Sequence, residues 1–161
     1  MKFSLPPTIA SVQDITALIA EIHDYSVWLN HQALKQRVGK KSTSYGPTMS
    51  PAADNLILQW IGKHEPDSAS MDALAASLEH YRQTAQSVTI TLAAPASVSI
   101  KTELVGWFRK HLNSELIVNF QFNSTILGGM VIRYGSRVFD WSFRRQLLAD
   151  RAKFPEVLRH V

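Results

Sequence analysis

The sequence predicts an α+β protein, with an N-terminal all-helical bundle followed by a small β-α-β-β-α part. From Val12 to Ala33, apolar residues recur at alternating three- and four-residue steps, which is the spacing of one face of a long helix. No strand pattern precedes residue 87, where the segment SVTITLA (Ser87–Ala93) begins to alternate apolar and polar side chains as a half-buried strand does. We therefore expect a helical bundle domain over residues 1–86 and a small α/β domain over residues 87–161.

Three helices can be placed in the first domain. Gly39 should end the first one, because glycine accepts the left-handed backbone that follows a helix end. The second should begin with Ser50 as N-cap and Pro51 at its first position, and should close at Gly62. The third is expected from about residue 71 to 86. The apolar face of the first helix should consist of Val12, Ile15, Ile19, Ile22, Ser26, Leu29 and Ala33.

The second domain is expected to hold four strands, the last of them short, and two helices. Gly135-Ser136 has the residue types of a two-residue hairpin turn, with glycine supplying the positive φ of its first position. Asp140 or Ser142 should cap the last helix, which stops before Pro155. The expected strands are 87–93, 115–122, 130–134 and 137–140, and the expected helices are 97–112 and a last one that runs toward residue 151.

The charge of the chain is concentrated in its second part. Residues 1–86 carry seven Lys/Arg against eight Asp/Glu, whereas residues 87–161 carry ten against five. A basic domain suits an acidic partner, which can be a protein surface, a lipid headgroup or a nucleic acid. A merely soluble basic domain explains the same numbers.

The residues indicate no reaction centre. The chain has no cysteine, so thiolate metal sites, disulfides and cysteine nucleophiles are excluded. Its six histidines do not have metal-ligand spacing, and Gly39–Ser42 lacks the upstream glycine of a phosphate-binding loop. We expect no catalytic residue, no metal and no cofactor, although an unrecognised enzyme remains an alternative.

No apolar run approaches the roughly 18 residues of a membrane span. The first residues, MKFSLPPTIASVQD, lack the longer apolar region of a signal peptide. These two observations favour a cytoplasmic protein.

A basic RNA- or ribosome-associated binding module is the alternative that the second domain invites. Aromatic side chains on a sheet can stack on bases, and the expected strands carry Phe120, Phe122, Tyr134 and Phe139. No RNA-binding signature accompanies them, and in a small α/β layer such aromatics are more often core. We therefore expect no nucleic-acid partner.

The segment ILGGMVIRYGSRVFDWSFRRQL (Ile126–Leu147) carries a family resemblance. It resembles the C-terminal signature of the delta subunit of F-type ATP synthases, the counterpart of the mitochondrial oligomycin-sensitivity-conferring protein. The signature consists of a leucine-isoleucine-type pair, two glycines, a strand that ends in glycine, a short strand that closes on aspartate, and a serine before a basic helix. The matching residues are Ile126, Leu127, Gly128, Gly129, Val131, Ile132, Arg133, Gly135, Val138, Asp140, Ser142, Arg144 and Leu147.

The resemblance implies a non-catalytic stator subunit with a shortened N-terminal helical domain. Such a subunit ties the peripheral stalk to the catalytic hexamer, so that proton flow drives ATP synthesis. The implied partners are the N-terminal segments of the alpha subunits and the b subunits of the peripheral stalk. The implied location is the cytoplasmic face of the plasma membrane, reached only through the complex. We expect structural roles for Gly128, Gly129, Gly135, Asp140 and Ser142, and partner contacts from Arg133, Arg137, Arg144, Arg145 and Arg151.

Overall fold

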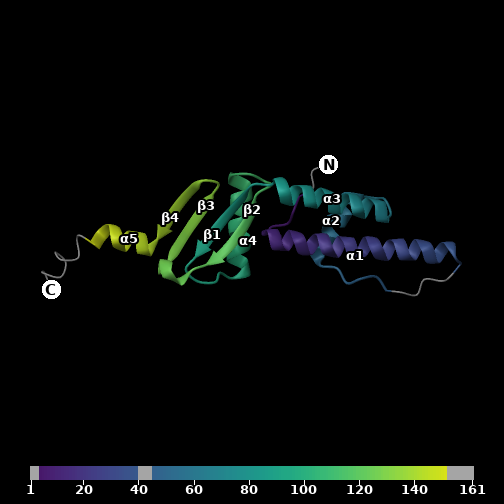
Figure 1. Cartoon of the computed structure of the whole chain (residues 1–161), viewed down its shortest axis with the longest axis horizontal. Helices are drawn as coiled ribbons and strands as arrows, with labels where there is room; N and C mark the ends of the chain where they lie inside the picture. Colours follow the sequence, from purple (N-terminus) through teal and green to yellow (C-terminus); the bar gives the residue numbers. More distant parts are fainter. Residues whose placement is uncertain (1–3, 40–44, 152–161) are drawn as a thin grey trace. The chain divides into compact units, whose positions relative to one another are not determined.

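A computed structural model describes residues 4–39 and 45–151 of the chain. The chain divides into two compact units, Met1–Ala85 and Gln86–Val161 (Figure 1). Within the described residues, the first unit holds helices and no strand, and the second holds a four-stranded mixed sheet with helices. This arrangement confirms the expected α+β class.

The first unit is built from three helices whose starts follow from capping. They are α1 (Val12–Arg37), α2 (Pro51–Ile61) and α3 (Ser68–Thr84). Ser11 and Asp14 form a capping box at the start of α1, and the Ser50 side chain accepts from the backbone N–H of Ala53 at the start of α2. Each cap satisfies backbone N–H groups that a helix leaves unpaired in its first turn.

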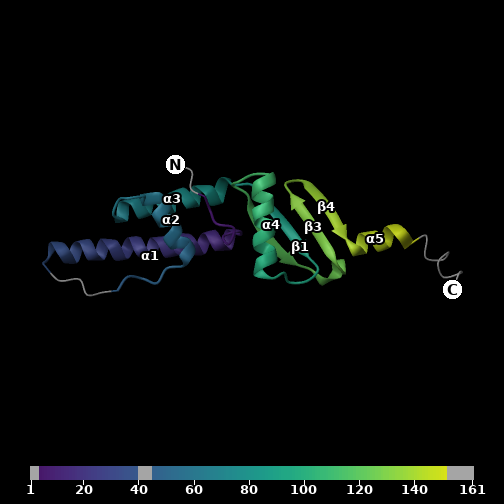
Figure 2. The same ribbon diagram turned by 180° about the vertical axis from the view of Figure 1, so that it is seen from behind.

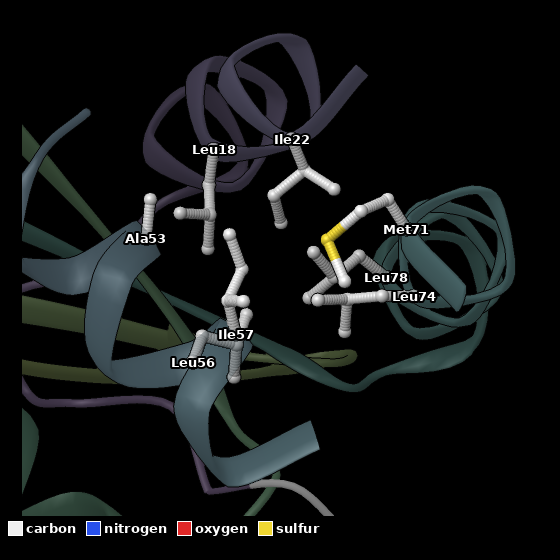
Figure 3. Close-up of a cluster of buried hydrophobic side chains, with 8 residues drawn as sticks. All are labelled: Leu18, Ile22, Ala53, Leu56, Ile57, Met71, Leu74 and Leu78. Carbon is white, nitrogen blue, oxygen red and sulfur yellow. The ribbon is translucent and has the colours of Figure 1, made fainter. Parts of the chain in front are cut away.

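Helices α1 and α3 lie side by side and run in opposite directions. The Ser26 hydroxyl donates to Asp72 Oδ1 at 2.7 Å near the start of α3, and Arg82 near its end donates to the Thr16 hydroxyl at 3.0 Å. Figure 3 shows the apolar side chains that the three helices direct toward one another. This core consists of Leu18, Ile22, Ala53, Leu56, Ile57, Met71, Leu74 and Leu78.

Two expectations for the first unit were wrong in detail. Helix α3 begins at Ser68 rather than near residue 71, because Asp67 caps it by accepting from the N–H of Ser70. Ala33 is exposed although it continues the apolar spacing of α1. Helix α3 starts beside Ser26, whose hydroxyl also donates to the Ser68 carbonyl, so the last turns of α1 have no part of α3 beside them.

In the second unit a parallel strand pair is extended by an antiparallel hairpin. Strand β1 pairs in parallel with β2, and β3 pairs antiparallel with both β1 and β4, which gives the order β2-β1-β3-β4. Helix α4 crosses over between β1 and β2, as a parallel pair requires. The bounds are β1 Ser87–Leu92, α4 Val98–His111, β2 Ile117–Phe122, β3 Gly129–Tyr134, β4 Arg137–Ser142 and α5 Phe143–Asp150, with a short 3₁₀ helix η1 over Ser124–Ile126.

The strand registers divide the side chains of the sheet between two chemically different faces. One face is almost entirely apolar in three cross-strand rows, and α4 packs on it through the buried Val105 and Phe108. The other face carries mainly polar residues, among them Thr89, Thr91 and Arg133. The rows of the apolar face are Phe122, Leu92, Met130 and Trp141; Phe120, Ile90, Ile132 and Phe139; and Val118, Val88, Tyr134 and Arg137.

The packing of the strand aromatics and of β4 differs from expectation. Phe122 and Phe139 are exposed rather than core residues. Strand β4 continues to Ser142 instead of stopping at Asp140, because its pairing with β3 extends to Gly129. Val138 is 54% exposed, since it lies on the sheet face opposite α4.

The core of the first unit leads to a stability prediction. Leu74 is fully buried among the three helices, so Leu74→Ala should lower the free energy of unfolding by about 2–5 kcal/mol, through lost burial and the cavity left behind. Leu58→Ala is the matched control, because Leu58 on α2 is 61% exposed and its truncation should change stability by less than about 0.5 kcal/mol. Guanidinium unfolding followed by helical circular dichroism measures both. Equal midpoints for the two variants would contradict this core.

Candidate functional site

The paired glycines of the C-terminal signature lie against the junction between β4 and α5. A side chain at Gly128 would collide with the ring of Phe143, and one at Gly129 would collide with the carbonyl oxygen of Trp141. Gly129 also has a φ of +74°, which side-chain-bearing residues rarely adopt. The N–H of Phe143 donates to the Gly128 carbonyl at 3.0 Å, which ties the start of β3 to the start of α5. The two glycines therefore allow the start of β3 to approach the β4–α5 junction closely.

Gly135 opens the turn between β3 and β4. Its φ is +57°, and Tyr134 pairs directly with Arg137 across the turn. Ser136 is not among the described residues with positive φ, which is the pattern of a turn that needs glycine at its first position only. A two-residue hairpin was predicted here and is confirmed.

Asp140 and Ser142 together start the last helix. The Asp140 carboxylate accepts from the Ser142 N–H at 2.9 Å, and the Ser142 hydroxyl accepts from the Arg145 N–H at 3.2 Å. Hydrogen bonds from Ser142 lower the pKa of Asp140 below its ordinary value of 3.8, with smaller effects from Arg145 and Arg144. Because the folded pKa is lowered, this contact stabilises the fold above about pH 4 and is lost as the pH falls through the folded value. Ser142, rather than Asp140, is the N-cap of α5.

The five arginines proposed as partner contacts do not form one patch. Arg133 and Arg137 border a polar hollow of about 530 Å³ at the hairpin, together with Gln86, Ser87 and Thr89. Arg144 and Arg145 lie in the first turn of α5, where Arg145 donates to the Asp140 carbonyl at 3.1 Å. Arg151 lies at the other end of α5 as its C-cap. The structure thus places two arginines at the hairpin and three on α5.

An apolar groove lies beside α4, over the β3–β4 half of the sheet. Helix α4 covers β1 and β2, and Figure 2 shows no helix in front of β3 and β4. The groove has a volume of about 570 Å³. It is lined by Val88, Leu104, Trp107, Phe108, Leu112, Met130, Ile132, Tyr134, Arg137, Phe139 and Trp141.

The groove exposes large apolar side chains from both of its walls. Trp107 on α4 is 53% exposed, and Phe139 and Trp141 on β4 are 42% and 56% exposed. Contiguous exposed apolar surface of this kind marks an interaction site more often than the isolated exposed residues that every protein carries. Arg137 is the one charged side chain among the described lining residues. This chemistry suits an apolar partner surface with a carboxylate at one end.

Of the groove residues, the sequence predicted Arg137 as a partner contact and offered Tyr134 and Phe139 only as stacking aromatics of the RNA alternative. It did not predict the apolar groove, although a signal for it exists. In RVFDWS (Arg137–Ser142) the aromatic residues Phe139 and Trp141 alternate with Val138 and Asp140, so both aromatics lie on one face of β4. Alternation alone does not say whether that face meets a helix of the same chain. The fold has to be known before these two residues can be read as surface.

Over 4–39 and 45–151, no three histidine, aspartate or glutamate side chains lie close enough together to hold a metal ion. In the same ranges no helix has the length and apolar character needed to cross a membrane.

Two of the three signature glycines, Gly129 and Gly135, should differ in their tolerance of substitution. Gly129→Ala introduces a Cβ against the Trp141 carbonyl and keeps the positive φ, so it should destabilise the second unit by about 2–5 kcal/mol. Gly135→Ala meets no atom within 4 Å and should lose only about 1–2 kcal/mol from its backbone conformation. Urea unfolding of both variants measures the order, and a larger loss at Gly135 would contradict the close approach of Gly129 to β4.

Two curated relatives align with part of the chain. ATP synthase subunit delta from Salinibacter ruber is 36% identical over 66 residues, which are 40% of this chain and 35% of the relative. ATP synthase subunit delta from Desulforudis audaxviator is 36% identical over 58 residues, which are 36% of this chain and 32% of the relative. Each alignment thus spans about a third of the relative's length.

The sequence model of the family "ATP synthase delta (OSCP) subunit" matches a much longer stretch, residues 8–152. This range includes all three helices of the first unit as well as the sheet and α5 of the second. The chain as a whole, and not only its C-terminal signature, therefore belongs to the ATP synthase delta (OSCP) subunit family.

Proposed function

We propose that this chain is the non-catalytic stator subunit that links the peripheral stalk of an F-type ATP synthase to its catalytic hexamer. In this role it prevents the hexamer from turning with the rotor, so that proton translocation drives ATP synthesis. The partners are the N-terminal segments of the alpha subunits and the b subunits of the stalk. The chain is held at the cytoplasmic face of the plasma membrane through the complex.

Membership of the delta family is the observation that carries this proposal. The form of the second unit supports it. A stator has to hold a macromolecule against torque, which calls for a broad and durable interface more than for a small enclosed site. The groove between α4 and β4 is open, apolar and rich in aromatic side chains, as the central parts of protein interfaces are. We assign the contact with the stalk to this groove.

The RNA-binding alternative finds less support in the same surface. Exposed Phe139 and Trp141 are suitable for stacking on bases, but phosphate binding also requires several cations on the aromatic face. Arg137 is the one cation among the described groove residues, and Arg133 lies on the opposite face of the sheet. Arg133 and Arg137 do border one hollow at the hairpin, but Arg133 does not line the aromatic groove, and an apolar protein segment needs no further cation there.

Changing one face of β4 tests the assigned contact. Phe139→Asp should place a carboxylate in the apolar groove and remove the chain from purified ATP synthase, or weaken its retention at least tenfold, because an interfacial aromatic anchor is commonly worth 2 kcal/mol or more. Val138→Asp is the matched control, since Val138 is adjacent, similarly exposed and on the other face. Quantitative mass spectrometry of the complex, isolated through a tagged beta subunit, measures retention.

Two outcomes of this experiment would each contradict a different part of the proposal. If the unaltered chain is absent from the isolated ATP synthase, the stator proposal is wrong. If both variants are retained like the unaltered chain while it is present, the groove is not the stalk contact. Circular dichroism of the purified variants verifies that each one is folded.

A further inference from the structure

We infer that the polar hollow at the β3–β4 hairpin binds a phosphoryl group, either as inorganic phosphate or at the end of a small phosphorylated molecule. The hollow has a volume of about 530 Å³ and lies entirely within the second unit. Its walls are the start of β1, the end of β3 and the turn at Gly135. It is a different cavity from the groove assigned to the stalk, although Tyr134 and Arg137 border both. The inference is therefore independent of the stator role.

The charge of the hollow is positive and is not balanced by the protein. Arg133 and Arg137 both line it, and none of its described lining residues is Asp or Glu. Over residues 4–39 and 45–151, neither guanidinium group forms an ion pair or a hydrogen bond with another residue. Arg82 differs in this respect, because Glu79 pairs with it. Two cations that border one hollow without a counter-charge repel each other, and a bound anion offsets this repulsion.

The other polar groups of the hollow add hydrogen-bond donors. The Tyr134 hydroxyl donates to Gln86 Oε1 at 2.6 Å, which leaves both hydrogens of Gln86 Nε2 for a ligand. Thr89 pairs with Arg133 in the strand register, so their side chains leave the sheet on the same face. Ser87 lies on that face as well, because it is two residues before Thr89 in β1. The described lining thus offers guanidinium, amide and hydroxyl donors and no carboxylate.

The number and type of these donors favour a phosphoryl group over a carboxylate. A carboxylate has two oxygens and one negative charge, whereas a phosphoryl group has three acceptor oxygens and a charge of about −1.5 to −2 at pH 7. Arg133 and Arg137 together balance that charge, and the planar fork of each can donate two parallel hydrogen bonds to phosphate oxygens. The Gln86 amide and the hydroxyls of Ser87 and Thr89 can then donate to the remaining oxygen lone pairs.

The size and surroundings of the hollow favour a small molecule over a nucleic acid. Pockets for small molecules commonly have volumes of about 300–1,000 Å³, and this hollow is within that range. A single-stranded nucleic acid requires a basic groove that continues along its backbone. On the face that carries Thr89 and Arg133, the next cross-strand row contains Thr91, Val131 and Asp140. The Asp140 carboxylate would repel a second phosphate there, so the hollow suits one phosphoryl group and not a chain of them.

Titration of the full chain with inorganic phosphate tests the inference. Potassium phosphate is added to ¹⁵N-labelled protein at constant ionic strength, set with potassium chloride, and the amide shifts are followed by NMR. Saturable shifts are expected at Ser87, Arg133 and Ser136, with a dissociation constant on the order of 1 mM, because a few solvent-accessible charge-assisted hydrogen bonds supply roughly this affinity. Shifts that grow without saturation, or that chloride alone reproduces, would overturn the inference.

Removal of one cation separates the hollow from the general charge of the domain. Arg133→Gln should raise the dissociation constant for phosphate at least about fivefold, because it removes one of two guanidinium partners. Arg144→Gln is the matched control, since it removes the same charge from the first turn of α5, outside the hollow, and should change binding less than about twofold. The amide spectrum of each variant verifies its fold, and Arg137→Gln repeats the test at the second cation. Equal weakening by the hollow variants and the control would contradict the site.

Three further ligands identify the chemistry and its source. Succinate, a dianion with two carboxylates, should bind at least about fivefold more weakly than phosphate, and equal binding would overturn the phosphoryl assignment. Glycerol 3-phosphate distinguishes the two sources, since tighter binding than inorganic phosphate supports a phosphorylated small molecule and weaker binding supports the free ion. A single-stranded oligothymidylate that shifts the same amides and binds more tightly than either would assign the hollow to nucleic acid and overturn the inference.

Discussion

The second unit depends on a geometric constraint: the single helix α4 is too narrow to cover a sheet of four strands. Helix α4 is about as wide as two strands, so it covers much of the β1–β2 half of the apolar face, although Phe122 stays exposed. It leaves Phe139 and Trp141 of β4 open to the solvent. In many small α/β layers a second helix returns to complete such a face. Here the element that follows β4 is α5, an eight-residue helix with no buried residue. The exposed aromatic surface follows from this arrangement and does not arise from disorder in the sheet.

The glycines and helix caps of the family signature support that surface without lining it, whereas Ile132 of the signature is one of the groove residues. Gly128 and Gly129 let the start of β3 approach the β4–α5 junction closely, and Gly135 closes the hairpin that holds Phe139 and Trp141 in register. Asp140 and Ser142 then start α5. A motif whose glycines and caps fix the backbone is recognisable in sequence because few residue types can replace them. The side chains proposed to contact a partner are subject only to the looser demands of an apolar surface.

The two units also differ in how completely they bury their apolar side chains. Three helices close around a shared core in the first unit, and most of its large side chains are covered there. The second unit buries the centre of its sheet through Val88, Ile90 and Val118 but exposes one flank of it. The net positive charge of the chain comes from the same part, residues 87–161. Exposed aromatic side chains and the excess of basic residues thus both belong to the second unit.

The sequence alone determined the α+β class, the family, the helix cap at Ser50 and the turn at Gly135, because each depends on local residue chemistry or on a short motif. For the last helix it left Asp140 and Ser142 as alternative caps, and the structure selects Ser142. The sequence did not determine which strand aromatics are covered. Phe120 and Phe139 have the same alternation and lie in the same cross-strand row, yet only Phe120 lies under α4, where Lys101 is placed over its ring. That difference depends on strand order and on where a single helix crosses the sheet. Strand order and the position of the crossing helix are set by contacts between residues distant in the chain. Neither of them can be predicted from the periodicity of the sequence.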